Sequence, residues 1–386
     1  MKNDYLPKIL LLMCLSSLIM LLVFNYTPLD FYVNAGFIKG LTDHGEFTFV
    51  SGKPFYGFTS PLWIILNSLI VYLTGTNILI ILKIIGMLLS LASIPLVFFL
   101  SKKTGLRERY VFIITLLWAI NPYFLLNSVS GYETPLFTIL VLLTVLKFDK
   151  PIFSGILIGL SILARPEGIF LLAIPFFMMF KNRRHALSIA VALLIAIVWL
   201  VYAQIHFGTF IQRPFVLNWP LGEPTRRLLP LLPFGLIFLF IIAWIVSDKL
   251  LNIFSILCLV GILIVMVPVF QNKLSRSDEF ARTTANFLSI LKNGQCNTLV
   301  TNHGAVAYLS NMKIIDYNGM LSYVPPEYNN DPIAFMTTMK PCYLLADEDY
   351  VNKLVGINLT ILHSETITNW SILQPNQTFT LYKFNW

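Results

Sequence analysis

Asp30 is the residue whose position most suggests a chemical role. Asp30 lies a few residues after the first apolar run of the chain, in a polar stretch over residues 27–63 that is rich in glycine and aromatic residues. A carboxylate at a bilayer surface is unfavourable unless it is solvated, paired or used. Used chemically, it would act as a general base that accepts a proton. The structural alternative is that Asp30 caps the helix that follows.

Other ionisable residues accompany Asp30. Lys83 is the basic residue that falls inside the predicted apolar spans, where a lysine either extends its ammonium group to the surface or contacts a phosphate. Glu133 occurs in SGYETPLF, Arg165 and Glu167 occur in LARPEG, and Arg213 occurs in HFGTFIQRPF. Arg165 is a candidate phosphate ligand, but it is equally able to pair with Glu133 or Glu167.

The composition indicates a membrane protein, whose helices would hold these ionisable residues near the membrane surface. The chain has 386 residues, of which 56% are hydrophobic and 12% charged, with a mean hydropathy of +0.74. Soluble domains contain roughly 25% charged residues. The net charge of +8 does not indicate a nucleic-acid partner, because many of the basic residues lie in short loops between apolar runs.

The apolar runs predict an all-α polytopic membrane region over residues 1–270 with about nine transmembrane helices. The run over residues 61–73 is shorter than the roughly 20 residues of a spanning helix, so we place it in the outer interface. The first run is typical of a signal peptide or an anchor, and we predict an uncleaved anchor because no small-x-small cleavage pattern follows. The predicted spans are residues 1–24, 78–100, 110–127, 135–146, 152–163, 168–180, 186–205, 229–246 and 251–270.

The basic residues predict the orientation. Cytoplasmic loops of membrane proteins carry an excess of lysine and arginine. This rule places the amino terminus in the cytoplasm, the loop over residues 25–63 outside and the carboxyl terminus outside the plasma membrane. The residues then on the cytoplasmic side are Lys2, Lys8, Lys102, Lys103, Arg107, Arg109, Lys147, Lys150, Lys181, Arg183, Arg184 and Lys249. Those outside before residue 271 are Lys39, Lys53, Arg165, Arg213, Arg226 and Arg227, with Glu223.

Five segments carry a resemblance. In order along the chain they are LDFYVNAGFIKGL with GKPFYGFTSPLW, SGYETPLF, LARPEG, HFGTFIQRPF, and HGAVAYLSNMKIIDYNGML. With them the chain resembles the C superfamily of membrane glycosyltransferases. It is similar in particular to the arabinofuranosyltransferases of mycobacterial cell walls and to mannosyltransferase-like proteins that use dolichyl- or polyprenyl-phosphate sugars.

The resemblance implies a function in glycosylation at the cell envelope. A sugar would pass from a polyprenyl- or dolichyl-phosphate donor to an acceptor glycan, lipid or protein. Asp30 would be the catalytic base. The positive charge for the leaving phosphate would come from Lys83, Arg165 and Arg213, or from a divalent cation such as Mg²⁺ or Mn²⁺. Glu133, Glu167 and Trp63 would support the site, whereas none of the 5 histidines has the spacing of a zinc site.

A different class of function stays open. Relatives carry two adjacent acidic residues where this chain has Leu29 and Asp30, and they tend to be longer. The alternative is therefore a non-catalytic protein that binds lipid-linked sugars, or a flippase or transporter. A transporter is expected to have its ionisable residues near mid-membrane, whereas here they gather at one surface, which favours the enzyme.

From residue 271 the composition predicts a small extracytoplasmic α/β domain that reaches residue 386. Residues 277–291 read as an amphipathic helix, and a further helical stretch is expected over residues 350–355. Short apolar runs typical of strands occupy residues 297–302, 306–310, 313–317, 342–347 and 380–384. His303 is a candidate catalytic residue, with a histidine at the edge of the core as the structural alternative.

The 4 cysteines divide by environment. Cys14 and Cys258 lie in apolar runs and are expected to be packing residues. Cys296 and Cys342 both fall in the predicted outer domain, where a disulfide bond persists. The sequence leaves open whether these two are linked or free, since it does not give their separation.

Overall fold

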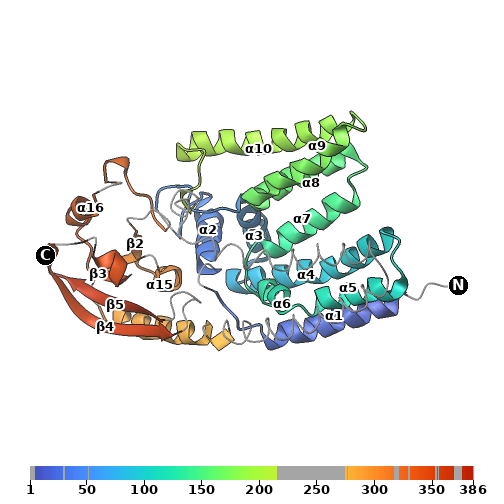
Figure 1. The fold of residues 1–386 in the computed structure, drawn as a ribbon. Coiled ribbons are helices and arrows are strands. Elements are labelled where there is room, and N and C mark those ends of the chain that lie inside the picture. Colours follow the sequence, from blue (N-terminus) through green and yellow to red (C-terminus); the bar gives the residue numbers. More distant parts are fainter. Residues whose placement is uncertain are drawn as a thin grey trace.

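The computed structural model describes residues 5–214 except 29, 30 and 51, residues 274–368 except 276, 295, 302, 317–320, 329, 330, 353 and 355, and residues 376–385. A helical part comes first, and a smaller part with a sheet follows it (Figure 1). The structure thus confirms a mostly helical fold with a small C-terminal sheet.

The helical part places most of its helices side by side, with α2 and α3 at the end nearest the sheet (Figure 1). Its elements are α1 (Tyr5–Leu22), α2 (Phe31–His44), α3 (Pro61–Thr74), α4 (Ile78–Lys103), α5 (Glu108–Ala119), α6 (Pro122–Val129), α7 (Thr134–Leu146), α8 (Pro151–Ala164), the 3₁₀ helix η1 (Pro166–Leu172), α9 (Ala173–Met179) and α10 (His185–Phe207).

Fewer helices than predicted are long enough to cross a bilayer. In the described part of the chain, α1, α4 and α10 pass by length and composition, and the bent pair of α5 and α6 would be a fourth. Helices α7 and α8, and η1 with α9, are apolar but shorter. The predicted spans over residues 229–246 and 251–270 lie outside the described residues, as do Glu223, Arg226 and Arg227. The number of nine spans therefore stays a prediction.

The predicted span over residues 110–127 is not one straight helix. Helix α5 ends at Ala119, and α6 begins at Pro122 with a bend of 48° between them. Pro122 has no backbone NH to continue the ladder, and the side chain of Asn121 instead accepts hydrogen bonds from the NH groups of Tyr123 and Phe124 at 2.9 and 3.2 Å. These two residues break the helix.

The polar stretch after α1 contains helix α2, the helix that the capping alternative for Asp30 required. Helix α2 buries Phe31, Ala35 and Ile38, which recur every three or four residues and so share one face. Gly40 lets the backbone of Thr48 lie against the helix, since a Cβ there would meet the Thr48 carbonyl oxygen. Helix α3, which begins with Pro61, has 14 residues, so it rises roughly 21 Å, short of the roughly 30 Å of a hydrocarbon core.

Basic residues gather at one end of the bundle. Lys102 lies over the ring of Tyr5, and Lys8 pairs with Glu108, so the start of α1 meets the turn between α4 and α5. Lys103 donates to the carbonyl oxygen of Leu146 at 3.3 Å, which adds the turn between α7 and α8. These basic turns lie at the end away from the sheet (Figure 1).

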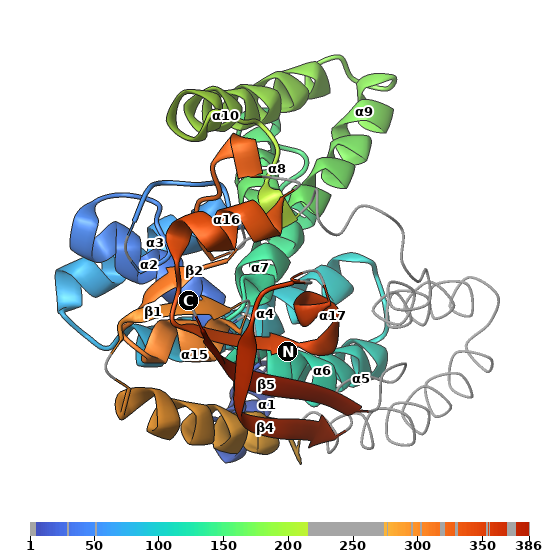
Figure 2. The same cartoon turned by 90° about the vertical axis from the view of Figure 1, so that its left-hand side faces the viewer.

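The C-terminal part is a mixed sheet flanked by helices, seen from its own side in Figure 2. The strand order is β2-β1-β3-β5-β4, in which β1 runs parallel to β2 and β3, and β5 runs antiparallel to β3 and β4. The elements are a helix over residues 277–292, β1 (Thr298–Thr301), α15 (Gly304–Leu309), β2 (Lys313–Ile315), the 3₁₀ helix η3 (Pro326–Tyr328), α16 (Pro332–Met339), β3 (Tyr343–Asp347), α17 (Glu348–Val351), β4 (Leu359–Thr368) and β5 (Asn376–Phe384).

Most of the predicted elements of this part are present, two predictions fail, and one strand was not predicted. The amphipathic helix and the strands β1, β2, β3 and β5 form where the apolar runs predicted them. The run over residues 306–310 is helix α15 instead, because His303 caps a helical turn there. Helix α17 ends at Val351, earlier than expected, and the long strand β4 was not predicted because its side chains are largely polar or exposed.

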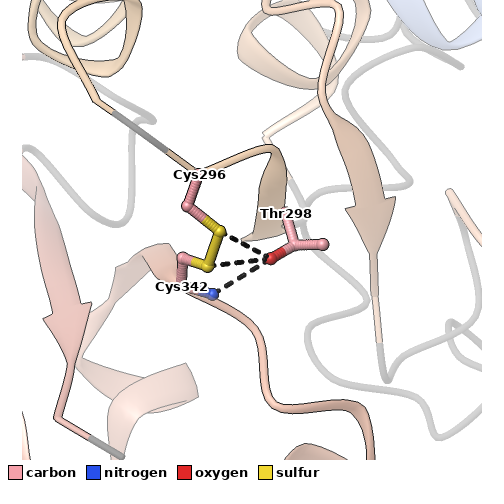
Figure 3. The surroundings of a disulfide bond; sticks show 3 residues. All are labelled: Cys296, Thr298 and Cys342. Carbon is pink, nitrogen blue, oxygen red and sulfur yellow. Dashed lines mark hydrogen bonds between the residues drawn. A yellow bond between two sulfur atoms is a disulfide. The ribbon is translucent and has the colours of Figure 1, made fainter.

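Cys296 and Cys342 form the disulfide bond that the sequence left open (Figure 3). Their Cα atoms are 6.2 Å apart, within the usual range for a bridge. The hydroxyl of Thr298, at the start of β1, accepts a hydrogen bond from the backbone NH of Cys342 at 3.1 Å. The bridge therefore joins the segment before β1 to the segment before β3.

Candidate functional site

The segment between α1 and α2 is the centre of the candidate site. Asp30 and Leu29 lie outside the described residues, immediately before α2. The residues on either side, 23–28 and 31–32, are described, and side chains from several distant parts of the chain contact them.

Lys83 of α4 is the main anchor of the segment. Lys83 is only 7% exposed. Its Nζ donates to the carbonyl oxygens of Phe24 and Tyr26 at 2.6 and 2.9 Å and to Thr27 Oγ1 at 3.1 Å. The ammonium also lies 5.4 Å from the ring centroid of Phe31. Carbonyl groups beyond the end of a helix lack partners, and a cation satisfies them well. The side chain is neither simply extended to the surface nor open to a ligand, as each proton donor is engaged.

Trp63 connects the first two motif segments. Its indole Nε1 donates to the carbonyl oxygen of Gly131 at 3.0 Å, and the Trp63 side chain is fully buried. Gly131 has φ +72°, and a Cβ at this position would come within 2.3 Å of the Phe31 ring. Only glycine therefore allows the turn before Glu133 to lie against the residue that follows Asp30. The supporting role expected for Trp63 fits this geometry.

Arg165 is held between two carboxylates. Its Nη1 is 3.0 Å from Glu133 Oε1, and its Nη2 is 3.0 Å from Glu167 Oε1. Burial opposes the charge of Arg165, but the Glu133 carboxylate first and then Glu167 outweigh it, so the pKa of Arg165 is raised. The structure thus brings together three predicted site residues, and it favours the paired state of Arg165.

Arg213 belongs to a second junction on the same polar stretch. Its backbone NH donates to the carbonyl oxygen of Tyr56 at 2.8 Å. The Tyr56 hydroxyl accepts hydrogen bonds from Trp199 Nε1 at 2.6 Å and from Gln212 Nε2 at 3.2 Å. The segment after α10 therefore docks on residues 52–59. Tyr56, which sequence reasoning did not single out, is the residue around which this junction forms.

The C-terminal part closes over the segment from the other side. Ser277 Oγ accepts from the backbone NH of Thr27 at 2.8 Å and donates to its carbonyl oxygen at 3.2 Å. The ring of Tyr308 on α15 lies 5.9 Å from that of Tyr32, and Lys39 Nζ lies 5.8 Å from the Tyr308 ring centroid. No sequence signal distinguished Ser277, and Tyr308 was marked only as part of the fifth segment of the resemblance, because the contacts of both are far away in the chain.

His303 is a core residue. Its ring is buried, stacks on Phe280 at 4.7 Å and meets Phe379 edge-on at 5.2 Å. Its Nδ1 accepts from the backbone NH of Val306 at 3.4 Å and so caps α15. Burial lowers the pKa of His303 to about 4, so the ring is neutral at pH 7. These contacts favour the structural alternative over a catalytic role.

The described residues offer little for a divalent cation. Among them, no group of three or more His, Cys, Asp or Glu side chains is placed to hold a metal ion. Glu133 and Glu167 are both used by Arg165, so they do not fit a metal in this arrangement.

Searches with protein-family models and against curated protein sequences found no match to the chain.

Proposed function

We propose that this chain is a membrane glycosyltransferase that moves a sugar from a polyprenyl- or dolichyl-phosphate donor to a glycan, lipid or protein acceptor at the outer face of the membrane. One observation supports it above the others. The five segments that carry the resemblance are spread over most of the sequence, yet each contacts the polar stretch around Asp30 or a neighbouring segment that does.

Within this proposal the residues have distinct roles. Asp30 takes the proton of the acceptor hydroxyl. Lys83 holds the segment that carries Asp30, so we assign it to positioning rather than to phosphate binding. Arg165 keeps the turn before α7 fixed to the start of η1 through Glu133 and Glu167. Arg213 is the remaining proposed contact for the donor phosphate.

The proposed sidedness rests on charge. The basic turns that contain Lys102, Lys103 and Lys147 lie at the end of the bundle away from the sheet (Figure 1). Because short basic loops favour the cytoplasm, we place the opposite end, with Asp30 and the C-terminal part, outside the plasma membrane.

The decisive experiment is Asp30→Asn. Asparagine keeps the size and the capping ability of aspartate but does not accept a proton. We expect at least a roughly hundredfold loss of sugar transfer, since a general base contributes about 10² to 10⁴ in rate. Transfer from radiolabelled lipid-phosphate sugars to membrane acceptors measures it, with Asp149→Asn, an exposed change at the other end of the bundle, as the matched control.

Two results would contradict the proposal. If Asp30→Asn retains transfer, the base lies elsewhere, with Glu133 first and then Asp43 or Glu46. If the wild-type protein binds the donor and never consumes it, the chain is the non-catalytic binder or flippase that Leu29, in place of a second acidic residue, favours.

A further inference from the structure

A pocket lies where the C-terminal part meets the segment around Asp30. Its volume is about 240 Å³, and it is bordered by Asn25, Thr27 and Tyr32, by the helix over residues 277–292 and by the end of α15. In the sequence, Asp30 stands between two of its lining residues, Thr27 and Tyr32. The pocket is smaller than the roughly 300–1,000 Å³ of drug-sized sites, so it suits a ligand of about one sugar ring.

Polar groups line this pocket. Thr284 is 4% exposed, and its hydroxyl oxygen is buried and has no hydrogen-bond partner among the described residues. The side chains of Asn25 and Asp278, which are exposed, and of half-buried Tyr32 also line the pocket and are open to a ligand. A buried hydroxyl without a partner requires an explanation, and convergent polar groups on an apolar wall are typical of a binding site.

The charge of the lining selects the class of ligand. Among the described lining residues there is one carboxylate, Asp278, and no lysine, arginine or histidine. Burial raises the pKa of Tyr32, so its phenol stays protonated and neutral. A phosphate or another anion would meet Asp278 with no cation among the described lining residues to balance it, because the nearby Lys83 ammonium is held by Phe24, Tyr26 and Thr27. A neutral ligand with several hydroxyl groups would instead donate to Asp278 and accept from Asn25 and Tyr32.

The apolar part of the lining fits the same ligand. Phe280, Leu288 and Leu309 contribute carbon surface beside the polar groups. The Phe280 ring is fixed by stacking on His303 at 4.7 Å. A sugar ring has one face of C–H groups that contacts such a surface while its hydroxyl groups point to the polar side chains.

We propose that this pocket binds a neutral sugar unit of the acceptor and presents it beside the segment that carries Asp30. That the bound sugar belongs to the acceptor rests on the proposed function. The donor sugar is joined to a phosphate, which no cation among the described lining residues would balance, whereas the acceptor brings only hydroxyl groups.

Saturation-transfer NMR on the purified full-length chain tests the pocket directly. The probes are methyl α-mannopyranoside and methyl α-arabinofuranoside, with inorganic phosphate as competitor. We expect at least one glycoside to bind, phosphate not to displace it, and Asp278→Asn and Thr284→Val each to weaken binding about three- to tenfold. Ala285→Leu, which adds a side chain at the pocket wall, is expected to weaken it at least tenfold, whereas Ser289→Leu on the same helix leaves it unchanged.

Three outcomes would overturn the inference: no binding of either glycoside, binding that survives both Asp278→Asn and Ala285→Leu, or displacement by phosphate. Asp278 is exposed, so its substitution tests the pocket without risk to the fold. Asp30→Asn separates the two proposals, since it should keep glycoside binding while it abolishes transfer. Binding without transfer in the wild-type chain would refute the enzyme and leave the sugar pocket standing.

Discussion

Replacing Lys83 by methionine tests the proposed anchor of the catalytic segment. Methionine keeps the length and apolar stem of the side chain, but it removes the ammonium that donates to Phe24, Tyr26 and Thr27. A hydrogen bond to a charged group contributes about 1.5–3 kcal/mol. Three bonds on one ammonium do not add, and its removal also relieves the burial of a charge. We therefore expect the segment to lose about 3 kcal/mol of local stability.

Hydrogen exchange measures this loss where it occurs. The backbone NH groups of Val23, Phe24 and Tyr26 donate to carbonyl oxygens one turn earlier, so they are protected while the segment is closed. A loss of about 3 kcal/mol corresponds to roughly 150-fold faster exchange. Peptides from α10 should be unaffected. Lys39→Met is the matched control, because the Lys39 ammonium only lies over the Tyr308 ring at 5.8 Å.

The opposite result is as clear. If Lys83→Met leaves the exchange of residues 23–28 unchanged and instead weakens binding of the lipid-phosphate donor, Lys83 is a phosphate ligand and the anchoring argument is wrong.

Three further predictions concern other parts of the chain. First, burial lowers the pKa of His303 to about 4, from an unfolded value near 6.5. The neutral ring therefore adds up to about 3 kcal/mol to the free energy of unfolding above pH 6.5, and this contribution is lost as the pH falls toward 4. Hydrogen exchange of the core strands in the full chain between pH 7.5 and 4.5 should show this loss of stability. His303→Asn, which keeps a helix cap, should flatten the pH dependence of the stability. An equally steep pH dependence in the variant would exclude His303 as its cause. Second, the Cys296–Cys342 bridge spans 46 residues, so Cys296→Ser with Cys342→Ser should lower stability by about 4 kcal/mol. Free thiols in non-reduced protein from an oxidising compartment would contradict the bridge. Third, in a background without Cys14 and Cys258, an impermeant maleimide should label Lys292→Cys on intact cells and Thr104→Cys only after permeabilisation; labelling of both from one side would refute the proposed orientation.

The sequence alone determined the class of the molecule and its local elements. Long apolar runs require helices in a membrane, so composition and length sufficed for the mostly helical fold. Amphipathic and short apolar runs are local signals, and they located the helix predicted over residues 277–291 and four of the five strands. Pro122 also carried the signal for the break between α5 and α6, although the apolar run concealed it.

Only the tertiary structure decided how distant residues are used. The role of Lys83 could not be assigned from its position in α4, because its partners are carbonyl oxygens 59 and 57 positions earlier in the chain. The state of Arg165 was open until Glu133, 32 positions away, was placed beside it. Ser277 and the pocket depend on the C-terminal part folding back onto residues 25–32, at a separation of 250 positions. Such contacts follow from packing of whole elements, and no local pattern of residue types encodes which carbonyl, ring or carboxylate a given side chain will meet.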